Sequence, residues 1–393
     1  MTRPEPIVTT PQHRRERWLV AGLFGLGAVV RADVLPEDRT DILYHRYDGG
    51  GLVVQGPSVL VRKKIGDSVS LSYQYYEDVI SSASIDVVSQ ASPYKERRTQ
   101  NNAGLTYLHG NTLYSIGFIN SDEPDYKSNT GFFSISQSMF GDLTTISFGF
   151  TRGWDKVGEV DHGIVVRSFS EDADHRNWSV GLSQVLTRNM LLGLNFETDE
   201  SNGYLQNPYR GVRFVDPTVA RGYSFGPARD PSTRTGSAAS AQLKYYLPWH
   251  AAVQGDYRFY TDTWGILADT VKLGYTQTLW TSWILDARAR YYWQTHANFY
   301  SDLYPYENSQ NFLSRDRELA QFHGLTLGVG ASWEFHPAWP RWLEKGTLNF
   351  SYDRMRIDYE DFHNNLIPSV VPGEEPLYVL DASVIQFFIS FWY

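Results

Sequence analysis

Hydrophobic and polar residues alternate with a period of two along most of this chain. The last segment shows the pattern most clearly, because one of its faces carries Ile385, Phe387, Ile389, Phe391 and Tyr393. A period of two indicates β-strands with one apolar face. Counting back from this segment predicts about sixteen strands, at residues 40–47, 52–64, 67–79, 98–109, 112–121, 129–140, 142–153, 175–187, 189–199, 234–247, 250–262, 266–280, 282–297, 320–336, 343–357 and 380–393.

The connections between these segments are alternately short and long. The long ones, at 80–97, 154–174, 200–233, 298–319 and 358–379, are rich in Pro, Asp, Asn and Gly. Membrane barrels have short periplasmic turns, long outer loops and an even number of strands. The sequence therefore predicts an all-β fold: a transmembrane antiparallel β-barrel of about 16 strands, an up-and-down meander with short periplasmic turns and long extracellular loops.

Both chain ends carry features of an exported barrel. Three arginines within 13–17 precede an uncharged apolar run at 18–30, and Val30-Arg31-Ala32 has the small residues of a cleavage site. We expect a signal peptide at 1–32 and one barrel domain at 33–393. The alternative, a membrane anchor, is disfavoured because about 13 apolar residues fall short of the roughly 20 that a spanning helix needs.

The closing strand has the pattern of an insertion signal. Phe387, Ile389, Phe391 and Tyr393 would present an apolar, aromatic edge to lipid while the strand pairs with the first one. A soluble sandwich can also end in an apolar strand. The N-terminal export signal favours the membrane barrel over that alternative.

Tryptophans gather near the short connections and the C-terminus. Indole prefers the boundary between hydrocarbon and headgroups, so this placement predicts a periplasmic aromatic girdle. Its members are Trp249, Trp280, Trp283, Trp339, Trp342 and Trp392.

Charged residues occupy the second face of several C-terminal strands. Because an arginine at the bilayer midplane costs about 2–4 kcal/mol, this face should line the lumen. The expected charged wall consists of Asp256, Arg258, Asp262, Lys272, Asp286, Arg288, Arg290, His296 and Glu334. The N-terminal strands would instead form a small, neutral, serine-rich wall. The two walls could create a permeation path with a transverse field, or paired charges could simply fill a hydrophilic interior.

Composition excludes several kinds of chemistry. The chain has no cysteine, which rules out disulfides and thiol redox chemistry, and its net charge of −9 disfavours a nucleic-acid-binding surface. The ten histidines include no closely spaced pair on one strand, and no motif selects a catalytic triad. We therefore expect no enzyme and assign no catalytic, cofactor-binding or metal-binding residues.

Three stretches, 256–270, 290–302 and 314–319, resemble an uncharacterised family of proteobacterial outer-membrane proteins with a domain of unknown function. Residues 78–84 and 91–94 are similar to its N-terminal signature, although Ser82 stands where that family would have Gly. The resemblance implies a barrel without an established activity. It also suggests genes encoded nearby for a small lipoprotein, a thioredoxin-like protein and a flavin-attaching enzyme, which would point to a periplasmic redox partner.

Two functions are compatible with these observations. The first is a porin-like channel for small polar solutes in the outer membrane of a Gram-negative cell, since about sixteen strands enclose a lumen wide enough for water. The second is a non-catalytic scaffold or sheath that holds a partner such as a small lipoprotein or redox protein. Either protein would contact outer-membrane lipid, lipopolysaccharide and the barrel-assembly machinery.

Overall fold

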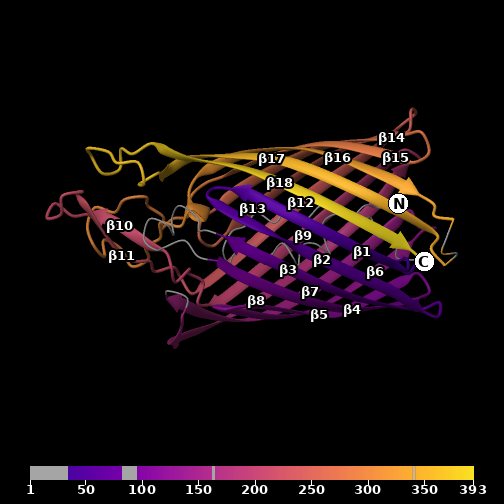
Figure 1. The fold of residues 1–393 in the computed structure, drawn as a ribbon, viewed down its shortest axis with the longest axis horizontal. Coiled ribbons are helices and arrows are strands. Elements are labelled where there is room, and N and C mark those ends of the chain that lie inside the picture. Colours follow the sequence, from indigo (N-terminus) through magenta and orange to yellow (C-terminus); the bar gives the residue numbers. More distant parts are fainter. Residues whose placement is uncertain (1–33, 82–94, 162–163, 339, 341) are drawn as a thin grey trace.

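Sixteen antiparallel strands close into one barrel in the computed structural model (Figure 1), as the sequence predicts. The structure describes residues 34–81, 95–161, 164–338, 340 and 342–393, so the expected signal peptide lies outside it. Strand order follows the chain except that a separate hairpin interrupts it between the ninth and tenth barrel strands. The barrel strands are β1 (Arg39–Gly49), β2 (Leu52–Ile65), β3 (Val69–Ser81), β4 (Lys95–His109), β5 (Thr112–Glu123), β6 (Tyr126–Met139), β7 (Thr144–Asp161), β8 (Ile164–Thr187), β9 (Met190–Gly203), β12 (Thr233–Leu247), β13 (Ala251–Asp262), β14 (Leu267–Leu279), β15 (Trp283–Gln294), β16 (Phe322–Phe335), β17 (Lys345–His363) and β18 (Leu377–Trp392).

The first and last strands join to close the sheet. β1 pairs antiparallel with β18 from Arg39 opposite Trp392 to Gly49 opposite Ala382. The Tyr393 hydroxyl then lies 3.2 Å from Thr40 Oγ1 and donates a hydrogen bond to the Arg62 carbonyl. Closure leaves no free sheet edge, which a membrane-spanning sheet cannot tolerate.

The two ends of the barrel differ (Figure 1). Both described chain ends and the short turns after β2, β4, β6, β8, β12 and β14 lie at one end, the turn end. The long loops after β9, β15 and β17 lie at the other, the loop end, together with the short turns after β1, β5 and β13. In barrels of this architecture the loop end faces the cell exterior. No helix in the described part of the chain is long and apolar enough to span a membrane, and its one helical element is the 3-10 turn η1 (Arg317–Leu319).

Three of the predicted loops contain more β-structure than expected. β7 and β8 continue through most of 154–174, β17 runs to His363, and 200–233 contains the hairpin of β10 (Gly211–Val215) and β11 (Tyr223–Pro227). The prediction was wrong here because charged residues on both faces look like loop. A strand that extends beyond the membrane can carry such residues without cost, because water surrounds it.

The barrel wall has an apolar outer face and a polar inner face over most of its height. On β15, Leu285, Ala287 and Tyr291 are exposed on the outside, whereas Asp286 and Arg288 alternate with them on the inside. A belt of exposed aliphatic and aromatic residues continues over the neighbouring strands, with Leu327 on β16 53% exposed. Such a belt is the surface that lipid covers.

Near the loop end this polarity reverses. On β17 the outward residues change from Phe350 and Tyr352 to charged ones, and the inward residues change from Asp353 to the buried Met355 and Ile357. The pairing with β18 stays in register through this point, so no bulge causes the change. β18 shows the same reversal, from inward Gln386 to inward Val384, Ala382 and Leu380. On β17 and β18 the inward face is therefore apolar at the level where the outward face of β17 becomes polar.

Candidate functional site: the lumen wall and the cap at the loop end

Arg288 holds the densest ion-pair group of the charged wall. Its Nη1 lies 2.8 Å from Asp286 Oδ2, and its Nε and Nη2 donate to the two carboxylate oxygens of Asp353 at 2.8 and 2.5 Å. Asp353 is two strands away, because Gly328 on β16 lies between them. A Cβ atom at Gly328 would come within 2.6 Å of Arg288 Nε. Glycine at this position lets the pair lie flat against the wall.

The neighbouring charges of this wall have separate partners. Arg258 donates through Nε to Glu197 Oε1 at 3.1 Å, and Asp256 accepts from Gln242 and Gln254 at 2.6 and 2.7 Å. Arg290 places its guanidinium 5.3 Å from the Tyr292 ring centre. Lys272 stands opposite Arg290 in the β14–β15 register, and its side chain forms no hydrogen bond or ion pair with any part of the chain that the structure describes. Strands β13 to β17 thus carry charges of both signs on their inward face.

Three other residues expected in this wall lie near the barrel ends. Asp262 ends β13 and accepts from the backbone N–H groups of Trp264 and Ile266, as well as from Arg234. His296 follows β15 and is half exposed, with Nδ1 2.8 Å from Asp361 Oδ2. Glu334 lies near the turn end, 3.6 Å from His336 and 3.9 Å from Lys345. These three residues therefore flank the lumen rather than line its middle.

The serine-rich wall is less neutral than the sequence suggests. Ser72, Ser115, Ser134 and Ser147 alternate inward with outward apolar residues, as expected. Near the loop end, however, a buried cluster joins three strands: His45 Nε2 lies 2.7 Å from Asp78 Oδ1, and Arg98 Nη2 lies 2.5 Å from Asp78 Oδ2. The sequence does not predict this cluster, because its three residues lie far apart in the chain, each in a different strand.

The expected tryptophan girdle occupies the turn end. Trp249, Trp280 and Trp342 are exposed there, and Trp283 stacks against Trp333 with ring centres 6.4 Å apart. Trp339 lies outside the described residues. Trp392 differs from the others, because it shares the inward face of β18 with Ser390 and packs beneath Arg39 and Lys345. Phe387, Ile389 and Phe391 of the expected insertion signal lie on the outward face of β18, and Tyr393 follows the strand and reaches the β1–β2 region.

Three loops fold over the barrel mouth at the loop end and form what we call the cap: residues 204–232, 295–321 and 364–376. The first loop contains the β10–β11 hairpin, and the second adds backbone pairs to it, with Val215 N donating to Tyr304 O and Tyr304 N to Arg213 O, both at 2.9 Å. Phe299, Tyr300 and Leu319 of the second loop pack against the inward apolar ends of β17, β18, β1 and β2. The cap and the reversed ends of these strands share one hydrophobic core.

A buried charge network ties the three cap loops together. Arg213 in β10 makes a bidentate pair with Glu375 at 2.7 and 3.0 Å and also pairs with Asp302. Asp302 further accepts from Arg315, at 2.8 Å, and from His363 Nδ1, at 2.9 Å. Burial would raise the pKa of Asp302, but the His363 hydrogen bond and the two guanidinium groups lower it to about 2. One carboxylate therefore connects both long loops to the end of β17.

The segment 207–213 crosses the mouth as a strap. The Tyr209 hydroxyl donates to Asp125 in the β5–β6 turn at 2.5 Å, and Arg210 pairs with Asp316 and, at 3.2 Å, with Glu318. Arg213 continues to Glu375 on the far side. The strap thus links the serine-rich side of the barrel to the β16–β18 side.

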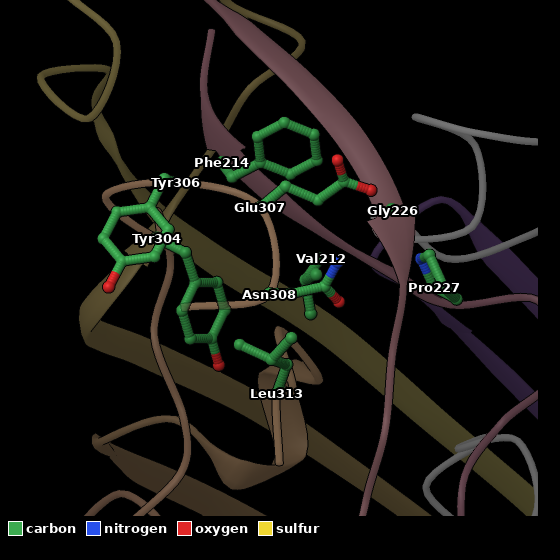
Figure 2. Close-up of a pocket in the computed structure, with 9 residues that line it drawn as sticks. All are labelled: Val212, Phe214, Gly226, Pro227, Tyr304, Tyr306, Glu307, Asn308 and Leu313. Atoms are coloured by element: carbon green, nitrogen blue, oxygen red, sulfur yellow. The ribbon is translucent and has the colours of Figure 1, made fainter. Parts of the chain in front are cut away.

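The hydrophobic cluster beneath the β10–β11 hairpin is packed rather than hollow. Figure 2 shows Val212, Tyr304 and Leu313 pointing toward one another beneath Phe214, and these residues form a small hydrophobic cluster. The cavity that they line has a volume of about 10 Å³, close to that of a single water-sized probe. A ligand larger than water does not fit there. Within the described residues, no three His, Cys, Asp or Glu side chains are arranged to hold a metal ion.

The stretches that resemble the uncharacterised family lie in the cap or at the strand ends that pack against it. Residues 256–270 include Trp264 and Ile266 of the shared core, 290–302 include Phe299 and Asp302, and 314–319 form the buried run around η1. The sequence predicts residues 298–319, which include parts of two of these stretches, to be a loop at the outer surface. The structure buries charged residues of this loop, because Asp316 pairs with Arg210 of the first cap loop, and Asp302 pairs with Arg213 of the first cap loop and with Arg315 of its own.

Comparison with solved structures finds outer-membrane proteins of low sequence identity. The alignment with a bacterial polysaccharide outer membrane secretin covers 91% of this chain and 100% of the secretin chain, at 8% identity and a TM-score of 0.49. The alignment with a FadL homologue from Pseudomonas aeruginosa covers 92% of this chain and 91% of the homologue, at 10% identity and a TM-score of 0.43. CdiB from Acinetobacter baumannii matches at 12% identity and a TM-score of 0.37. That alignment covers 90% of this chain but only 60% of the CdiB chain. These likenesses concern the fold alone.

No curated protein matches the chain. A family model described as "Protein of unknown function (DUF3570)" matches residues 28–352, which is most of the sequence. With its closed barrel of sixteen strands and its apolar outer belt, the protein is an outer-membrane β-barrel, and it belongs to the DUF3570 family of unknown function.

Proposed function

We propose that the protein is a channel for small polar solutes across the outer membrane, with a cap that narrows its outer mouth. The observation that carries this proposal is the accessibility of the charged wall. The side chains of Arg288 and Arg258 point inward yet are 26% and 30% exposed, which requires solvent-accessible space inside the barrel. At the loop end the inward residues of β17 and β18, such as Met355 and Leu380, are buried instead.

The side chains that line the lumen favour solutes that carry both hydrogen-bond donors and hydrogen-bond acceptors. Its charged wall presents carboxylates and guanidinium groups close together, while the facing wall presents hydroxyl groups. Balanced charges produce little net field along the pore, so strong selectivity for one ion sign is not favoured. We expect small neutral or zwitterionic molecules to pass.

Electrical recording from the purified protein in planar bilayers tests this proposal. Stable ohmic openings are expected, and silence would count against a channel. Replacing Arg288 and Arg290 together by Gln should shift the reversal potential in a salt gradient towards cation selectivity, because fixed positive charge leaves a confined pore. The matched control is Arg152→Gln with Arg356→Gln, which removes two arginines from the outer face of β7 and β17.

The unfolding temperature distinguishes arginines that line a conducting path from arginines that only neutralise carboxylates in the barrel interior. If the arginines serve only to neutralise carboxylates, Arg288→Gln leaves Asp353 and Asp286 poorly paired and lowers the unfolding temperature without changing selectivity. A stable variant with unchanged selectivity would place the conducting path away from this wall.

A non-catalytic scaffold or sheath remains the second candidate, and one observation favours it. The tip of the third cap loop exposes Leu366, Ile367, Val370 and Val371, with Val370 100% exposed. Apolar residues gathered at an exposed tip can mark a contact with another protein. Electrical silence combined with co-purification of a small lipoprotein or redox protein, lost when these four residues are replaced by Ser, would support the sheath.

A further inference from the structure

A groove lies on the outer surface of the barrel, just above the apolar belt and away from the lumen. Its volume is about 520 Å³, and it is bordered by the β1–β2 turn and by outward residues of β1, β17 and β18. Ser383 and Ile385 of β18 form its floor, with Arg46 on one side and Arg354 on the other. The small side chain of Ser383 leaves the space between the two arginines open.

The groove spans the level at which the outer face changes from apolar to charged. Tyr44 and Phe387 belong to the exposed belt below it, and Ile385 and Tyr352 line its lower part. Arg354 and Asp381 line its upper part. A ligand that fits this gradient has an apolar portion directed into the lipid and a polar headgroup directed towards the loop end.

Both guanidinium groups have N–H hydrogen-bond donors beyond those that their present partners use. Arg46 donates to Gln55 at 2.9 Å and to Asp48 at 2.9 Å, and Arg354 donates to Ser383 at 3.1 Å and to Asp381 at 3.0 Å. Each guanidinium has five N–H donors in a planar fork that suits phosphate oxygens. Two such forks on either side of a serine hydroxyl form a cradle for one phosphate group.

We propose that this groove binds the phosphorylated headgroup of an outer-leaflet glycolipid, the lipid A part of lipopolysaccharide, with one phosphate held between Arg46 and Arg354. The acyl chains lie along the belt below Ile385 and Tyr352. The site faces lipid on the outside of the barrel, so it is independent of whether the lumen conducts.

Asp48 and Asp381 limit the affinity but do not close the site. Both carboxylates border the groove and are half exposed, at 56% and 45%, so water and counterions screen their repulsion of a phosphate. Each arginine can keep its carboxylate partner while its remaining donors turn to the phosphate. Removing the carboxylates should therefore strengthen binding.

The test measures lipid binding to the intact detergent-solubilised barrel by native mass spectrometry. Probes are bisphosphorylated lipid A, fully dephosphorylated lipid A and inorganic phosphate. Wild-type protein should bind the bisphosphorylated lipid, and Arg46→Gln with Arg354→Gln should weaken that binding about tenfold, as expected for the loss of charge-assisted hydrogen bonds. Arg356→Gln is the matched control, because Arg356 lies on the same face of β17 two residues further out and bonds to Asp358. Heat-modifiable migration verifies that each variant is folded.

A second variant tests the groove itself. Ser383→Phe fills the floor without changing charge and should weaken binding of bisphosphorylated lipid A as much as the double arginine variant does. Equal binding of the phosphorylated and dephosphorylated lipids would overturn the proposal, as would unchanged binding in both groove variants. Inorganic phosphate that displaces the lipid at similar concentrations would assign the site to free phosphate instead and reject the lipid headgroup.

Discussion

The two halves of the strands β17 and β18 face opposite environments. Towards the turn end, Phe350 and Phe387 point out to lipid, and Asp353 points inward and pairs with Arg288, whose side chain is partly exposed in the lumen. Towards the loop end, Arg354 and Arg356 point out to water and Met355 points into the core shared with the cap. A barrel strand therefore has no fixed polar side. Each face has the polarity of its surroundings, which are lipid, the lumen, water or the cap core, and both faces change at the same level of β17.

Ion pairs at the loop end follow the same division. Arg213 is fully buried inside the cap with Asp302 and Glu375, whereas Arg354 and Asp381 pair on the exposed outer face. Exposed pairs contribute little because water screens them, while a buried charge depends on its partner. The cap network and the outer pairs should therefore respond very differently to the loss of one arginine.

Arg213→Met should have the largest effect of the substitutions considered. It leaves Glu375 and part of the Asp302 carboxylate buried without a cation, which should destabilise the cap by about 3–5 kcal/mol. Hydrogen exchange of residues 204–232, 295–321 and 364–376 measures this as lost protection, while the barrel strands keep theirs. Arg354→Met is the control, with an expected cost of about 0–1 kcal/mol. Equal effects of the two variants would contradict the distinction between inside and outside.

Substituting one residue on each face of β6 tests the comparison within the membrane. Phe133 points outward among apolar neighbours, and Ser134 points inward among serines. Phe133→Arg should cost about 2–4 kcal/mol because it places a charge in lipid. Ser134→Arg should cost much less, since its side chain reaches the solvated lumen. Reversible unfolding in urea with lipid vesicles measures both, and similar losses would place the two side chains in similar environments.

Acid should loosen the cap before the barrel. The pKa of Asp302 is lowered to about 2 in the folded protein, against an ordinary value of 3.8. A lowered carboxyl pKa contributes stability that is present above the ordinary pKa and is lost as pH falls through the folded pKa. The loss should amount to about 2 kcal/mol between pH 4 and 2.

Cap protection factors in hydrogen exchange, measured from pH 7 to pH 2, follow this loss. Asp302→Asn is the control: its cap should be less stable at pH 7 and should change less between pH 4 and 2. A cap that stays equally protected at pH 2 in the unmodified protein would show that the Asp302 network does not hold it.

The reversal on β17 has a sequence signal that a strand count overlooks. The apolar positions are Leu348, Phe350 and Tyr352 at first, then Met355, Ile357 and Tyr359, so the phase of the alternation shifts by one. The alternation predicts a strand that ends at 357 and a loop on the outer surface from 358 to 379. A phase shift without a bulge predicts that the buried face changes sides, but it does not identify what covers the new face.

The sequence by itself determined the barrel: its sixteen strands, the short turns at its turn end, its closing strand and, at membrane level, the face of each strand that meets lipid. These features depend on residues two positions apart or on neighbouring strands, and the period-2 pattern records them directly. Tertiary structure alone decided the cap. Arg213, Asp302 and Glu375 lie in three loops, up to 162 residues apart, and nothing local distinguishes them from solvated charges. Only the closed sheet brings these loops over one mouth, where they bury each other's charges.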